Sequence, residues 1–145
     1  MTDIGLTEVK EAASALSPWA HIATVGSDNT PDVVPVHPCW EGDDCWIMAG
    51  AKSVKAKNIA ANPNVAMHWQ VTENGDGVEV WGSAEVFTDL ETKRRLWEGV
   101  FDYDLNAFSP GGPDNSPDTA FVKVTPTRAI VLKAYGMGGI DRWKA

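Results

Sequence analysis

A serine and several lysines lie close together near residue 50. Lys52, Ser53, Lys55 and Lys57 surround the start of SVKAKNIAAN, a segment rich in good helix formers. The start of a helix offers free N–H groups and the positive end of its dipole, and neighbouring ammonium groups add charge. This pattern indicates a phosphate-binding site. From this feature alone, solvated surface lysines remain the alternative.

The charges of this segment run against the helix dipole. A second predicted helix, 88–97, starts with a capping box of Thr88 and Glu91 and has its basic residues later. The helix after Ser53 instead has lysines at its amino end and no acidic residue. Each such cation, when exposed, costs about 0.3–1 kcal/mol, so the arrangement is most favourable when an anion binds there.

Length and charge narrow the classes of protein. The 145 residues suit one domain, 1–145, and the net charge of −8 argues against a nucleic-acid-binding surface. The amino-terminal segment lacks the basic start and apolar middle of a secretory signal, and the longest apolar runs are only strand-sized. We therefore expect a cytoplasmic protein that does not associate with a membrane.

The histidines and cysteines show no metal-binding spacing. His21, His37 and His68 are far apart, and no motif such as HExxH is present, so no metal site is predicted. Cys39 and Cys45 flank a predicted turn. A disulfide between them is geometrically conceivable, but we expect reduced thiols in a chain without an export signal.

Short alternating segments separated by turn residues predict a mainly β protein. The expected strands are 19–25, 32–38, 45–49, 64–71, 78–88, 119–125 and 128–135. The expected helices are 7–16 with Thr7 as N-cap, 53–62 and 88–97. The strands and helices do not alternate regularly, which favours an antiparallel barrel with small attached helices. Residues 106–118 are expected to form a loop that shapes a rim.

Four stretches resemble the flavin-binding split-barrel family typified by pyridoxamine 5'-phosphate oxidase, particularly its general-stress-protein branch. They are PDVVPVHPCWEGDDCWIMAG, AKSVKAKNIAANPNVAMHW, WGSAEV and FSPGGPD. The resemblance covers most of 19–132, and SxKxxNIxxNP is its most specific part. It implies a mainly β (α+β) fold, an antiparallel split β-barrel of about six to seven strands with two or three short helices. It also implies a homodimer with two FMN molecules between its subunits.

The same resemblance implies which residues contact the cofactor. The family's Ser-Arg-Lys phosphate element maps onto Ser53, Val54 and Lys55, so a valine stands where the arginine is expected. Lys52 or Lys57 is the candidate to replace it. The residues that the resemblance places along the flavin ring are Val34, Pro35, Val36, His37, Met48 and Ala49. Those that it places across the dimer are Trp69, Gln70, Arg142 and Trp143.

Two of these residues have simple structural alternatives. A structural role at a strand end is favoured for His37 over a hydrogen bond to the flavin or proton donation to a substrate, and Trp69 is equally compatible with core packing between alternating residues. Val33 stands where the oxidase has a basic flavin contact, and the oxidation of vitamin B6 is therefore not predicted. No catalytic acid is assigned, because a flavin carries the redox chemistry itself.

The favoured interpretation is an FMN-dependent oxidoreductase that acts on a small organic substrate. One alternative is a reductase of the same fold that uses the deazaflavin F420. F420 has a long acidic tail that favours additional Lys or Arg around its groove, and this acidic chain offers few. The other alternative is a stress protein that binds a flavin without turnover.

Overall fold

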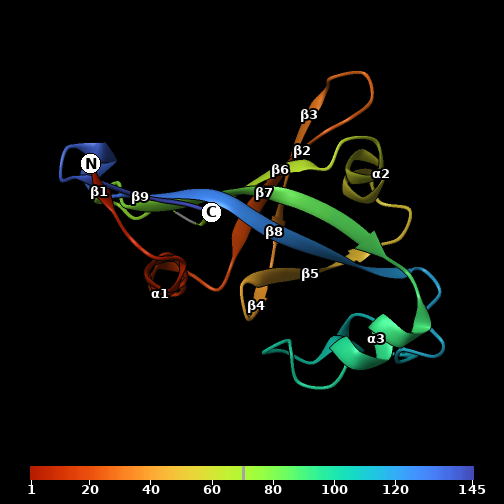
Figure 1. Ribbon diagram of the computed structural model, residues 1–145. Helices are drawn as coiled ribbons and strands as arrows, with labels where there is room; N and C mark the ends of the chain where they lie inside the picture. The colour runs from red at the N-terminus through yellow and green to blue at the C-terminus, as the bar shows by residue number, and fades with distance from the viewer. Residues whose placement is uncertain (70) are drawn as a thin grey trace.

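The computed structural model describes residues 1–69 and 71–145 and has a mostly-sheet α+β fold (Figure 1). The strands within these residues are β1 (Thr2–Asp3), β2 (Ala20–Val25), β3 (Pro31–Val36), β4 (Cys39–Glu41), β5 (Asp44–Gly50), β6 (Asn64–Trp69), β7 (Gly77–Phe87), β8 (Thr119–Leu132) and β9 (Ile140–Lys144). The helices are α1 (Leu6–Leu16), α2 (Val54–Ala61) and α3 (Leu90–Leu96), with 3-10 turns η1 (Leu105–Ala107) and η2 (Ala134–Gly136). The predicted α+β class is confirmed.

The nine strands described form one mixed sheet. Their order is β1-β9-β8-β7-β6-β2-β3, with β5 paired to β8 and β4 paired to β5. β1 pairs with β9 in parallel, and the other pairs of described strands are antiparallel. The expectation of a wholly antiparallel sheet of six to seven strands is thus corrected. The additional strands are the short β1, β4 and β9, whose lengths of two, three and five residues give weak sequence patterns.

The long strand β8 organises the sheet, because it pairs with three others. β7 follows it along one edge, while β5 pairs with its first half and β9 with its second half along the other edge. Pro126, which has no N–H group, lies where β8 passes from β5 to β9 and faces Gly82. The prediction of two strands, 119–125 and 128–135, was therefore wrong. The register with β7 shifts beside the proline, where Thr127 is skipped, but the strand does not end there.

Two helices start at other residues than expected. α1 is capped at Gly5 rather than Thr7, and α3 at Asp89 rather than Thr88. Asp89 Oδ2 accepts a hydrogen bond of 2.9 Å from the Thr92 N–H. An aspartate at this position satisfies a free helix donor and also places negative charge at the positive end of the dipole.

The buried apolar side chains form two clusters. The larger one lies between the sheet and α1 and α2, and includes the fully buried Ile22, Met67 and Val80. The smaller one contains Trp46, Leu96, Leu105 and Phe121 and packs beneath the segment after α3. This second cluster fixes the 97–118 loop, meaning the residues between α3 and β8, against the sheet.

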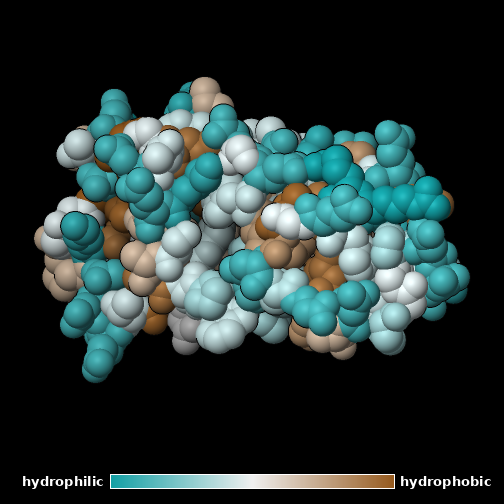
Figure 2. Space-filling view, turned by 90° about the horizontal axis from the view of Figure 1, so that it is seen from below, coloured by the Kyte–Doolittle hydropathy of each residue, from teal (hydrophilic) through white to brown (hydrophobic). Residues whose placement is uncertain are grey.

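The surface is hydrophilic but not uniformly so. On the face seen from below, apolar residues lie in recesses between hydrophilic ones (Figure 2). Among residues 1–69 and 71–145, no helix is long and apolar enough to cross a membrane.

Candidate functional site

A cavity of about 610 Å³ lies where β3, β5 and the start of α2 meet the 97–118 loop. This volume is within the usual range for a small-molecule site. Several of its lining residues were predicted from the sequence: Pro35, Val36, His37, Met48, Ala49 and Lys55. The strand ends therefore bring together residues that the sequence places in three separate segments.

Lys55 is the lysine of the predicted cluster that lines the cavity. Its side chain is half-buried, and this burial lowers the pKa of Lys55 from 10.5, while the charge of Asp32 acts in the opposite direction. Lys52 and Lys57 are exposed and do not line the cavity. One partly desolvated cation thus faces the cavity, and an anion beside it would recover the cost of its burial.

Ser53 acts as the N-cap of α2, and its hydroxyl group is already engaged. Ser53 Oγ accepts a hydrogen bond of 3.3 Å from the Ala56 N–H and donates one of 2.7 Å to the Gly50 carbonyl. The Lys57 N–H bonds to the Ser53 carbonyl at 3.1 Å. Ser53 therefore shapes the turn at the helix start, and the N–H groups of the first turn ahead of Ala56 have no partner within the helix.

The asparagine of the SxKxxN pattern, Asn58, attaches α2 to the sheet. Its Nδ2 donates a hydrogen bond of 3.0 Å to Oγ1 of Thr24, a buried residue of β2. Ala56 and Ile59 are buried on the same side of α2. These contacts hold the helix on the sheet, so its first turn stays at the edge of the cavity.

The 97–118 loop supplies an aromatic wall that the sequence did not reveal. Tyr103 lies against His37 with ring centroids 4.4 Å apart, and Phe108 packs edge-on against Tyr103 at 5.6 Å. Trp19 lies edge-on to His37, with ring centroids 6.4 Å apart. Of the predicted rim loop, 106–118, Phe108, Ser109 and Asp118 line the cavity, whereas the contact of Tyr103 with His37 depends on long-range packing that no local pattern indicates.

A polar end completes the cavity. The hydroxyl groups of Ser109 and Thr119 are 2.6 Å apart and both residues are buried, with Asp118 beside them on the lining. Lys93, itself buried, donates a hydrogen bond of 2.9 Å to the Ser116 carbonyl and so ties α3 to this part of the loop. The cavity therefore has Lys55, an apolar and aromatic middle, and a hydroxyl pair.

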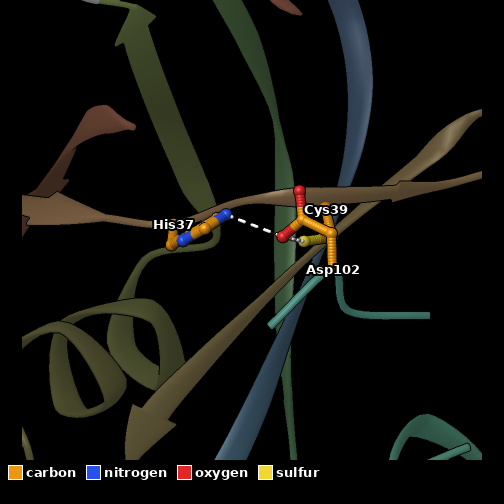
Figure 3. A group of neighbouring side chains, drawn as sticks. All are labelled: His37, Cys39 and Asp102. Atoms are coloured by element: carbon orange, nitrogen blue, oxygen red, sulfur yellow. Dashed lines mark hydrogen bonds and ion pairs between the residues drawn. The ribbon is translucent and has the colours of Figure 1, made fainter. Parts of the chain in front are cut away.

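His37, Cys39 and Asp102 converge beside this cavity (Figure 3). His37 Nε2 lies 2.8 Å from Asp102 Oδ1, and Cys39 Sγ donates to the same oxygen at 3.4 Å. The Nε2 atom is buried and, although it is close to Asp102 Oδ1, it makes no hydrogen bond of regular geometry.

This trio is not arranged for nucleophilic catalysis by a thiol. In a nucleophile–histidine–acid triad the histidine stands in the middle, whereas here Asp102 does. Burial raises the pKa of Cys39 to about 11, which keeps the thiol protonated at neutral pH, and burial also raises the pKa of Tyr103 to about 12. Cys39 and Cys45 are both free and buried.

Two predicted flavin contacts lie in the core of the chain. Val34 pairs with Ile22 across β2 and β3 and packs against the larger cluster. Trp69 is only 2% exposed and stacks on Trp40, with centroids 6.2 Å apart and an interplanar angle of 10°. For Trp69, the core-packing alternative describes what this chain shows.

The remaining predicted residues lie away from the cavity. Arg142 and Trp143 are on β9 and line a separate cavity, where Arg142 Nε contacts Asp3 Oδ1 at 3.0 Å. β9 lies at the opposite end of the sheet from α2 and α3 (Figure 1). Gln70 lies outside the described residues. Within one chain, therefore, the cofactor residues predicted near the carboxyl terminus do not meet Lys55.

A family model described as pyridoxamine 5'-phosphate oxidase matches residues 6–133. A sequence search of curated proteins found no match.

The fold is similar to that of several solved structures. A Clostridium acetobutylicum protein related to general stress protein 26 of Bacillus subtilis superposes with a TM-score of 0.76 at 17% identity, covering 96% of this chain and 93% of that one. A Nostoc punctiforme protein, described as oxidase-related and FMN-binding, gives 0.69 at 15% identity, with 94% and 86% covered. An F420 reductase gives 0.59 at 30% identity, with 79% and 90% covered. The first two likenesses establish the fold alone.

Proposed function

This chain belongs to the pyridoxamine 5'-phosphate oxidase family, and on that premise we propose that it binds FMN in the cavity beside Lys55. The observation that carries the proposal is the position of Lys55. It is a half-buried cation at the amino end of α2, on the wall of a cavity of ligand size. A cation so placed is stabilised by a bound anion, and FMN has a phosphate.

The residues around Lys55 fit the other parts of FMN. Pro35, Val36, Met48 and Ala49 offer an apolar surface to a flat ring, and the aromatic wall of the 97–118 loop faces the same cavity. The first-turn N–H groups of α2 would accompany Lys55 at the phosphate. When bound, FMN supplies the electron-transfer chemistry, while these residues bind it, orient it and exclude water.

The phosphate site would be weaker than the family pattern implies. Val54 stands in place of the arginine, and its side chain is 59% exposed. Lys52 and Lys57 are exposed and are not among the lining residues, which favours the backbone over either lysine as the replacement. Lysine binds a phosphate as a point charge without the paired hydrogen bonds of arginine. We therefore propose that Lys55 and the backbone carry the phosphate contact.

The proposal includes a homodimeric split barrel. Large apolar side chains, among them Trp19 and Val33, are exposed in the single chain, as expected where a partner subunit packs. Arg142 and Trp143, which are distant from Lys55 in one chain, would contact the cofactor of the partner subunit. A dimer mass in light scattering supports this part of the proposal, and a monomer at micromolar concentration contradicts it.

F420 is a second candidate cofactor, because the F420 reductase is 30% identical over 79% of this chain. The charge of the cavity favours FMN. Among the described lining residues Lys55 is the one lysine or arginine and Asp118 adds a carboxylate, whereas the acidic tail of F420 would require additional cations.

Identification of the bound cofactor tests the proposal. The purified chain is denatured, and the released ligand is analysed by mass and absorbance; FMN absorbs near ~450 nm and F420 near ~420 nm. The apo-protein is then titrated with each compound. FMN bound one per chain supports the proposal. Tight binding of F420 with no binding of FMN selects the second candidate, and binding of neither contradicts both.

We propose further that the bound flavin turns over, which makes the protein an oxidoreductase for a small organic substrate. The flavin is reduced anaerobically by NADH or NADPH and then mixed with a broad panel of acceptors other than oxygen. Reoxidation by one of them supports catalysis. Absence of reoxidation across the panel favours a flavin-binding stress protein without turnover.

A further inference from the structure

Three different donor atoms converge outside the phosphate end of the cavity. His37 Nε2, Cys39 Sγ and Asp102 Oδ1 all lie within 4.8 Å of one another. His37 directly follows β3 and Cys39 begins β4, while Asp102 comes from the 97–118 loop; the three side chains meet at one point (Figure 3). This cluster could not be predicted from local patterns, because Asp102 is 63 residues from Cys39.

Two of the three spacings between these atoms can be compared with those of a tetrahedral zinc site. Zinc bonds of about 2.0–2.3 Å to nitrogen, oxygen and sulfur place the donor atoms about 3.4–3.6 Å apart. The Cys39–Asp102 distance of 3.4 Å already agrees with this spacing. The His37–Asp102 distance of 2.8 Å has to open by about half an ångström. The Asp102 side chain is 68% exposed on a loop, so this shift meets little resistance.

The histidine nitrogen has no other satisfied role. His37 Nε2 is buried and makes no aligned hydrogen bond, although a buried polar atom without a partner is costly. Its ring packs against Tyr103, with ring centroids 4.4 Å apart, and the nitrogen points toward the Asp102 carboxylate (Figure 3). A cation between Nε2, Sγ and Oδ1 would satisfy all three atoms.

We propose that His37, Cys39 and Asp102 form a binding site for one Zn²⁺ ion. The set of one nitrogen, one sulfur and one oxygen donor suits zinc, whereas Mg²⁺ and Ca²⁺ prefer oxygen donors. On binding, the Cys39 S–H bond breaks, a Zn–S bond forms, and the proton passes to the buffer. Three protein ligands leave one position for water or for a polar group of another molecule.

The site would join the 97–118 loop to the strands. His37 lines the large cavity, while Cys39 and Asp102 line a neighbouring cavity of about 310 Å³. Zinc would therefore sit in the wall between the two cavities and fix Asp102 and Tyr103 at the rim. The sequence expectation of no metal site is revised by this contact between distant segments.

Metal titration of the full-length chain tests the proposal without any flavin readout. The protein is treated with a chelator, dialysed, and titrated with ZnCl₂ by calorimetry, and in parallel with Co²⁺ as a spectroscopic substitute. The expected result is one Zn²⁺ per chain and, for Co²⁺, a thiolate-to-metal charge-transfer band. Hydrogen exchange at residues 98–104 should slow when zinc is added.

Variants assign the ligands. Cys39→Ser should abolish the charge-transfer band, and Asp102→Asn should weaken zinc binding by at least about a hundredfold, the upper range seen for outer-shell partners. His21→Ala and Asp43→Asn, which change exposed residues of the same types, should leave the affinity unchanged. Asp102 is exposed, so Asp102→Asn remains informative if Cys39→Ser does not fold.

Three outcomes overturn the proposal. They are an absence of zinc binding, binding that persists in both Cys39→Ser and Asp102→Asn, and a loss of binding in Asp43→Asn as large as that in Asp102→Asn. None of them bears on FMN binding at Lys55, so the two proposals fail independently.

Discussion

Replacing Lys55 by methionine should weaken FMN binding without weakening the fold. Lys55→Met keeps the length of the side chain and removes its charge from the cavity wall. A hydrogen bond to a charged group contributes about 1.5–3 kcal/mol, and a tenfold change corresponds to about 1.4 kcal/mol. We therefore expect the Kd for FMN to rise about 10-fold to 150-fold.

The chain and the ligand each offer a matched control. Lys57→Met removes the same charge from the same helix at an exposed position outside the cavity, and should change the Kd by no more than about fivefold. Riboflavin lacks the phosphate, so its affinity should be nearly the same for the wild-type chain and Lys55→Met. The assay is calorimetric titration of apo-protein with FMN and with riboflavin.

The same variant should not lower the stability of the apo-protein. Lys55 is a half-buried cation near the positive end of the α2 dipole, so its removal should leave the melting temperature of the apo-protein unchanged or raise it. Lower FMN affinity with undiminished stability separates a phosphate contact from general damage. An equal loss for riboflavin and FMN, or a larger effect of Lys57→Met than of Lys55→Met, would refute the reasoning.

Three further predictions concern the same molecule. Val54→Arg restores the arginine of the family pattern at an exposed position and should tighten FMN about tenfold, the range of one charged hydrogen bond, without affecting riboflavin; a weaker FMN complex contradicts it. Because burial lowers the pKa of Lys55 below 10.5, its ammonium loses its proton earlier than an exposed lysine, and FMN affinity should fall as pH rises through that lowered pKa. Riboflavin titrated over the same pH range should not show this fall, and a parallel fall would assign it to another group. Phe121→Ala should reduce the free energy of unfolding in urea by about 3–5 kcal/mol, because this side chain is 0% exposed, whereas Phe108→Ala, at a position 71% exposed, should change it by less than about 0.5 kcal/mol. Similar values for the two variants would show that the smaller cluster does not hold the loop.

Local signals in the sequence located α2 and the phosphate end of the cavity. The serine N-cap, the lysine pattern and the Asn62-Pro63 stop all act within a few residues, and α2 spans Val54–Ala61 as these signals require. Lys55 was among the predicted cofactor residues for the same reason. The local lysine pattern did not separate Lys55 from Lys57, which only the family resemblance ranked, because their difference in burial depends on how the helix packs on β2.

Contacts between distant segments were beyond local patterns. Tyr103, Asp118 and Thr119 reach the cavity from the 97–118 loop and the start of β8, and nothing in their own neighbourhood marks them as lining residues. Pro126 led to the wrong prediction of a strand break, since the effect of a proline depends on which partner strand lies beside it. Whether a strand continues past such a residue depends on the side chains of the neighbouring strands in the sheet.

The most direct test of the central claim is a crystal structure of the chain with FMN bound. We predict that the phosphate lies within hydrogen-bond distance of Lys55 Nζ and the first-turn N–H groups of α2, with the flavin ring against β3 and β5. A flavin whose phosphate contacts neither Lys55 nor the start of α2, such as one seated in the cavity beside Trp40 and Trp69, would contradict the account.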